Sequence, residues 1–131
     1  MNTKLNKILA EISAGELIDK ITILEIKKEK IKNTDKLIDI EKELNTLNNT
    51  MAKFIPDTSV IDEFIQKLKS INIKLWYIED GKRLAEKNKE FGEDFIKLAR
   101  DVYKINDERA EIKLKINNAL GSNIKEVKSY E

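Results

Sequence analysis

Residues 95–121 read FIKLARDVYKINDERAEIKLKINNALG, and this stretch decides the fold. Its apolar side chains recur at alternating steps of three and four residues, the spacing of one face of an α-helix. They are Phe95, Leu98, Val102, Ile105, Ile112, Ile116 and Ala119. Position 109 lies in the same stripe and is an arginine. The stretch therefore predicts a long helix, ending at Gly121, that carries a charge in its apolar seam.

A first helix is expected to begin at Ala14. Ser13 and Glu16 fit a capping box, in which the serine hydroxyl accepts the N–H of Glu16 and the glutamate reaches back to the N–H of Ser13. Apolar residues between positions 17 and 26 cover more than one face of this helix. A helix that is apolar on several sides is usually packed on several sides, so we expect it to be the most buried.

Two further helices have narrow apolar seams. The second helix is predicted to start after Asn33 or Thr34 and to end before Pro56, the only proline. The third is predicted to run to about Asn88, with its N-terminal cap supplied from residues 57–59. Residues 7–12 and 123–130 are compatible with strand, helix or coil. The expected fold is all-α, an antiparallel four-helix bundle of two hairpins in one domain, residues 1–131, with short extended segments at the two ends as an option.

Composition limits the chemistry that this chain can perform. The 131 residues include no cysteine and no histidine, which excludes thiolate chemistry and leaves only Asp, Glu or Lys as a general base. With 25 basic and 24 acidic residues, the charge balance argues against a nucleic-acid partner. No apolar run is long enough to cross a membrane, and residues 1–13 lack the features of a signal peptide. We therefore expect a cytoplasmic protein.

The sequence contains only three arginines, Arg83, Arg100 and Arg109, against 22 lysines. If the third and fourth helices pair antiparallel around residues 88–93, Asn72 faces Arg109. The middle of that hairpin then carries a polar layer. Its members are Asn72, Trp76, Tyr103, Asn106, Arg109, Lys113 and Asn117.

This layer has two interpretations. Arg109 and Lys113 are one turn apart and could converge on a carboxylate or phosphate, so the layer is a candidate site for a small anion. Alternatively, the layer is structural and sets the register of the helices, with Arg109 paired to Glu79, Asp19 or Glu25. Glu16 and Asp19 share a helix face, but no second acidic pair accompanies them, so we predict no metal and no cofactor.

Three blocks carry a resemblance to known sequences. They are SAGELIDKITILEIK at 13–27, LWYIED at 75–80, and FGEDFIKLARDVYKINDERAEIKLKIN from 91, followed by GS and KSY up to 130. Together they resemble an uncharacterised family of short bacterial proteins of unknown function. The resemblance implies one compact helical domain and implies no chemistry.

The narrow seams, the balanced charge and the absence of histidine and cysteine favour a non-catalytic helical module that binds a protein partner or itself. A homodimer is the expected form. The alternative is an enzyme or sensor that binds a small anionic metabolite at the layer around Arg109.

Overall fold

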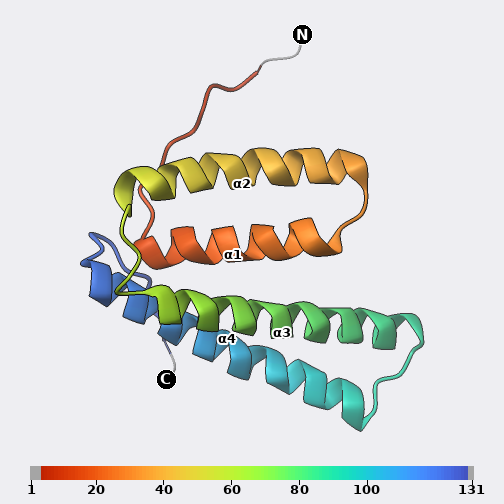
Figure 1. Cartoon of the computed structure of the whole chain (residues 1–131). Coiled ribbons are helices and arrows are strands. Elements are labelled where there is room, and N and C mark those ends of the chain that lie inside the picture. The colour runs from red at the N-terminus through yellow and green to blue at the C-terminus, as the bar shows by residue number, and fades with distance from the viewer. Residues whose placement is uncertain (1–3, 130–131) are drawn as a thin grey trace.

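The computed structural model describes residues 4–129, which contain four helices and no strand. The helices are α1 (Ala14–Lys30), α2 (Thr34–Phe54), α3 (Asp62–Lys87) and α4 (Glu93–Leu120) (Figure 1). Helices α1 and α2 form one antiparallel hairpin, and α3 and α4 form the other. The predicted all-α bundle of two hairpins is therefore confirmed.

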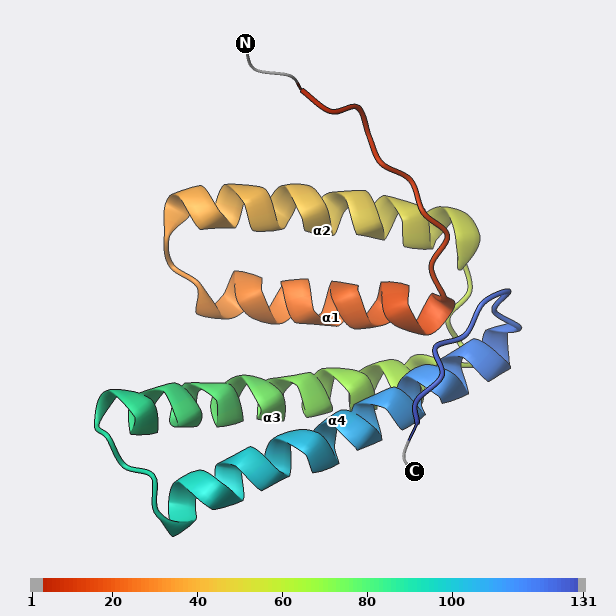
Figure 2. The ribbon, with the colours of Figure 1, turned by 180° about the vertical axis from the view of Figure 1, so that it is seen from behind.

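Helix α1 lies in the middle of the molecule. It packs against α2 on one side and against both α3 and α4 on the other, whereas α2 packs against α1 alone (Figures 1 and 2). This arrangement explains why α1 is apolar on several faces and is the most buried helix, as predicted. Only Ile40 and Leu44 are buried in α2, which covers the outside of the bundle.

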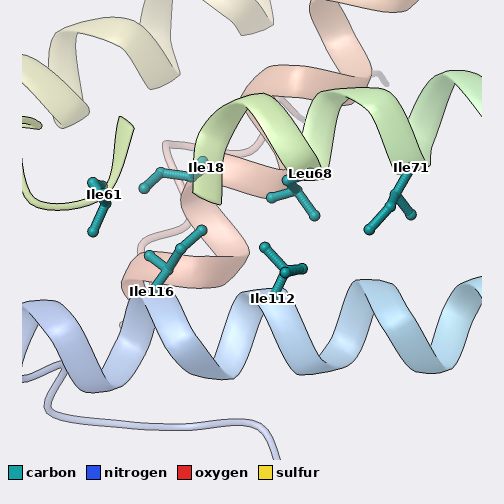
Figure 3. Close-up of a cluster of buried hydrophobic side chains, with 6 residues drawn as sticks. All are labelled: Ile18, Ile61, Leu68, Ile71, Ile112 and Ile116. Carbon is teal, nitrogen blue, oxygen red and sulfur yellow. The ribbon is translucent and has the colours of Figure 1, made fainter. Parts of the chain in front are cut away.

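Two apolar clusters make up the core, and α1 contributes to both. The first joins α1, α3 and α4 (Figure 3) and consists of Ile18, Ile61, Leu68, Ile71, Ile112 and Ile116. The second joins α1 and α2 and consists of Leu17, Ile21, Leu24, Ile40 and Leu44. Each buried isoleucine or leucine contributes roughly 1.5–3 kcal/mol relative to an exposed one, so these clusters account for the assembly of the two hairpins.

Three helix ends form at the predicted residues. The Ser13 hydroxyl accepts the N–H of Glu16 at 3.1 Å, and the Asn33 side chain accepts the N–H of Lys36 at 3.0 Å. Gly121 ends α4 in the left-handed conformation with φ of 62°, which favours glycine because it has no Cβ.

The predicted cap of the third helix is wrong. Helix α3 starts after Ile61, which supplies no side-chain cap. Thr58 donates its hydroxyl to Asp62, and Asp57 accepts the N–H of Ser59, so the polar residues 57–59 stabilise a turn before the helix. Ile61 has no exposed surface, and its burial in the core sets the position of the helix start.

The two end segments form neither strand nor helix within residues 4–129. Residues 4–12 lead away from the start of α1 past α2 (Figure 2). Residues 122–129 fold back, and Asn123 donates to Glu11 at 2.7 Å. Position 130 of the predicted segment lies outside the described residues. No helix in the described part of the chain is long and apolar enough to cross a membrane.

Candidate functional site

A polar cluster lies where α1 crosses α4, and an ion pair between Asp19 and Arg109 is its centre. Asp19 has no exposed surface, although it carries a charge. Arg109 donates from Nε to Asp19 Oδ1 at 2.9 Å and from Nη2 to Asp19 Oδ2. A two-point arrangement of this kind is the strongest way in which an arginine holds a carboxylate. Of the three partners predicted for Arg109, the structure selects Asp19.

Helix α3 completes the surroundings of Asp19. The Asn72 side-chain amide donates to Asp19 Oδ1 and to the hydroxyl of Thr22, both at 2.9 Å. Thr22 donates in turn to the backbone carbonyl of Asp19 at 2.8 Å. No buried side-chain nitrogen or oxygen in the described part of the chain lacks a hydrogen-bond partner. The buried charge of Asp19 is thus fully compensated, as a stable core requires.

Lys113 extends the cluster by one helical turn. Its side chain is only 8% exposed and donates to Glu16 at 2.6 Å and to Glu126 at 2.8 Å. The Asp19 carboxylate lies 3.9 Å from the same ammonium group. The expectation that Glu16 reaches back to the N–H of Ser13 is therefore corrected, because its carboxylate turns to Lys113 on the neighbouring helix. Among the described residues, no group of three or more acidic side chains could hold a metal ion.

The pKa shifts in this cluster favour the charged forms of its side chains. The hydrogen bonds that Arg109 donates to Asp19 raise the pKa of Arg109 above its usual value. Burial lowers the pKa of Lys113, but the hydrogen bonds to Glu126 and Glu16 outweigh it and the net shift is upward. The hydrogen bond from Lys113 lowers the pKa of Glu126. All three shifts favour the charged forms, as expected for groups that are held in ion pairs.

The other predicted site residues divide into two groups. Asn106 accepts from Arg109 Nη1 at 3.4 Å, and Trp76 lines a cleft beside Asn72 and Arg109. Asn117 lies further along α4, where it accepts the N–H of Gly15 at 2.6 Å. Tyr103 is exposed and lines neither of the clefts near Arg109. The structure thus gathers five predicted residues around Arg109 or Lys113 and leaves Tyr103 and Asn117 apart.

Two clefts open beside Arg109. The larger measures about 260 Å³ and lies between α1, α3 and α4. The smaller measures about 160 Å³, lies between α4 and the C-terminal segment, and is lined by Asn106, Arg109, Ala110, Lys113, Glu126 and Lys128. The polar cluster is therefore closed around Asp19 but reaches the surface on both sides of Arg109.

Sequence reasoning missed three contributors to this region. Thr22 is a polar residue inside the apolar part of α1, and that contrast was a usable signal for a buried polar contact. Arg83, which lines the larger cleft, belonged to the small set of arginines. Glu126 carried no signal, because its contact depends on how the C-terminal segment folds back.

Similarity to known sequences covers nearly the whole chain. The model of a family described as "Family of unknown function (DUF6165)" matches residues 8–131. The match confirms the resemblance to an uncharacterised family, while a bacterial origin stays a prediction. Comparison with curated proteins and with solved structures finds no match.

Proposed function

This chain belongs to DUF6165, a family of unknown function, and we propose that it is a non-catalytic helical interaction module that binds a second copy of itself. One observation carries the proposal. No residue from 73 to 111 is buried, although this range holds the distal halves of α3 and α4 and the loop between them. Figures 1 and 2 both show this end of the hairpin extending away from α1.

The uncovered half of the hairpin is apolar along its seam. Leu75, Ile78, Leu98 and Val102 are only partly covered. Beside them lie large exposed apolar side chains, namely Tyr77, Leu84, Phe91, Ile96 and Tyr103. Large contiguous apolar surfaces on a protein usually mark a site of association.

The total surface supports the same proposal. The accessible surface of the chain is 9867 Å². A compact monomer of 15.2 kDa would expose about 7,100 Å² by the usual scaling with mass. Residues 4–12 are exposed and no residue from 73 to 111 is buried, so the N-terminal segment and the protruding hairpin both contribute to the excess. A standard protein interface covers about 800 Å² on each partner, so the excess is large enough to include one.

A second copy is the partner that the charge pattern favours. Acidic and basic side chains alternate around the uncovered seam, as Glu93, Lys97, Arg100 and Asp101 illustrate. Such a surface selects neither a strongly acidic nor a strongly basic partner. A twofold axis brings the same surface together twice, so two hairpins would pair as a four-helix bundle with opposite charges facing each other.

Sedimentation velocity across micromolar concentrations tests the proposal. We expect a dimer that Ile96→Glu dissociates, because this side chain is 53% exposed and its replacement leaves the core intact. Leu9→Glu is the matched control, since Leu9 is 89% exposed but lies in the N-terminal segment. A monomer at high micromolar concentration, or a dimer that only Leu9→Glu dissociates, would contradict the proposal.

The second candidate function is binding of a small anionic metabolite, by a sensor or an enzyme, at the layer around Arg109. The smaller cleft supports it, because Arg109, Lys113 and Lys128 line this space. Glu126 already accepts a hydrogen bond from Lys113 in this cleft, so an added carboxylate or phosphate would have to displace the Glu126 side chain. A thermal-shift screen against phosphorylated and carboxylated metabolites tests this candidate. The variant Glu126→Gln removes the competing carboxylate from Lys113. A cytoplasmic location stays part of the proposal.

A further inference from the structure

The larger cleft, of about 260 Å³, combines an apolar wall with charged side chains at its edge. The wall consists of Ile23, Ile26, Leu75 and Trp76. Arg109 and the buried Asn72 line it as well, and Glu79, Asp80 and Arg83 come from the later turns of α3. Small-molecule sites in proteins typically have this composition, a mainly apolar lining with a few polar groups that orient the ligand.

The charged groups of this cleft differ in whether the protein already neutralises them. Arg109 is paired with Asp19, and Glu79 lies 3.5 Å from Lys82. Asp80 is exposed and takes part in none of the ion pairs found among the described residues. Arg83 is exposed, and no ion pair found among the described residues includes it. The cleft is therefore left with one carboxylate, Asp80, and one guanidinium group, Arg83, outside the ion pairs of the protein, and Arg83 is the group that can bind an anion.

In addition to the charge of Arg83, the cleft offers a ligand the apolar ring of Trp76. It is the only tryptophan in the chain, and it is only partly buried. A partly covered indole ring offers a flat apolar face, against which a planar molecule stacks favourably. Position 83 follows position 76 by seven residues, so both side chains project from the same face of α3.

We propose that this cleft binds a small organic monoanion, with a flat apolar body against Trp76 and a carboxylate held by Arg83. Pockets for drug-sized ligands measure about 300–1,000 Å³, so this smaller cleft suits a single aromatic ring with an acidic side chain. The planar guanidinium group matches the two oxygens of a carboxylate, which lysine would not do.

Titration of Trp76 fluorescence with phenylacetate tests the proposal, because the single tryptophan reports directly from the cleft. We expect a saturable change in its emission. Acetate at the same ionic strength should leave the emission unchanged, because it lacks the apolar body. Benzylamine should bind at least tenfold more weakly than phenylacetate, because its ammonium group cannot accept the hydrogen bonds that Arg83 donates and its charge is repelled by Arg83.

The matched variants are Arg83→Gln and Arg100→Gln, both at exposed arginines. Arg83→Gln should weaken phenylacetate binding by about tenfold or more, the usual effect of losing a hydrogen bond to a charged group. Arg100→Gln should leave binding unchanged, because Arg100 does not line the cleft. An unchanged melting temperature of Arg83→Gln would show that its fold is intact.

Three results would overturn this proposal. The first is the absence of a saturable signal with phenylacetate, and the second is tighter binding of benzylamine. The third is an equal loss of affinity in both arginine variants, which would indicate unspecific attraction by surface charge.

Discussion

Asp19 and Arg109 are 90 residues apart in the sequence, yet the guanidinium group of Arg109 holds both carboxylate oxygens of Asp19. Asp19 belongs to the first hairpin and Arg109 to the second. Their ion pair therefore forms only when α1 packs against α4. Because Asp19 is completely buried, its charge in the core is neutralised by Arg109 only when the two hairpins are docked.

We predict that Arg109→Leu destabilises the protein by roughly 3–5 kcal/mol, because the buried Asp19 carboxylate loses its cation. Arg109→Ala should cost at least as much, because it also removes the packing of the side-chain stem. The free energy of unfolding from urea denaturation measures both effects. An unchanged or more stable Arg109→Leu variant would mean that this arginine serves a ligand instead of the fold.

A second substitution separates the stranded charge from the lost packing. Asp19→Asn in the Arg109→Leu background removes the unpaired charge, so the double variant should be more stable than Arg109→Leu alone. The coupling energy from this double-mutant cycle should reach at least about 1 kcal/mol, as expected for residues in direct contact. Additive effects of the two substitutions would show that the pair contributes nothing.

Gly15→Ala should destabilise the protein by about 1–3 kcal/mol through overpacking. A Cβ at Gly15 would lie 2.5 Å from the backbone carbonyl oxygen of Lys113, which cannot move without shifting α4. Gly81→Ala is the control, because its Cβ would approach only the end of the Leu98 side chain, at 3.2 Å. Thermal unfolding should show a clear loss for Gly15→Ala and little change or a gain for Gly81→Ala, where alanine is also the better helix former.

Ser13→Ala should cost about 1 kcal/mol, because the N–H of Glu16 loses its acceptor at the start of α1. The chemical denaturation midpoint measures this loss. Ser59→Ala, at an exposed serine outside the helices, is expected to shift the midpoint much less. Equal midpoints for Ser13→Ala and the unmodified protein would contradict the role of Ser13 as the cap.

The contact between Glu126 and Lys113 should depend on pH. The pKa of Glu126 is lowered in the folded protein, so its contribution to stability is complete above pH 4.5, the ordinary value. It is lost as the pH falls through the lowered pKa. Because Glu126 is nearly half exposed, we expect Glu126→Gln to cost at most about 1 kcal/mol at neutral pH and nothing in acid.

Unfolding free energies of Glu126→Gln and the unmodified protein, measured at several pH values, check this prediction. Glu86→Gln, at an exposed position of α3, serves as the control. A cost of Glu126→Gln that stays constant down to pH values well below the lowered pKa would show that its origin is not the ion pair.

Local features of the sequence were enough to locate the helices. The cap residues Ser13 and Asn33 and the terminal Gly121 act within a few residues of their own position, through hydrogen bonds or backbone conformation. The start of α3 was not predictable in this way. Ile61 determines it by entering the core, and the position of the core depends on all four helices.

The candidate site could be predicted only in part, for a related reason. The seam of α4 identified Arg109 as a charge in need of a partner, and the antiparallel pairing of α3 and α4 brought Asn72 near it. The choice of Asp19 over Glu79 and Glu25 required the position of α1 against that hairpin. Helical periodicity specifies which residues share a face of one helix, but it contains no information on how two helices cross.

The sequence alone therefore determined the all-α fold, its two hairpins and the presence of a charge inside the seam of α4. These properties follow from hydrophobic spacing and capping, which are local. Only the tertiary structure decided that Asp19 neutralises Arg109, that Glu126 reaches Lys113, and that Arg83 and Trp76 share a cleft. The two ion pairs join separate segments, and the cleft lies between three helices, so the packing of α1 against both α3 and α4 decides both.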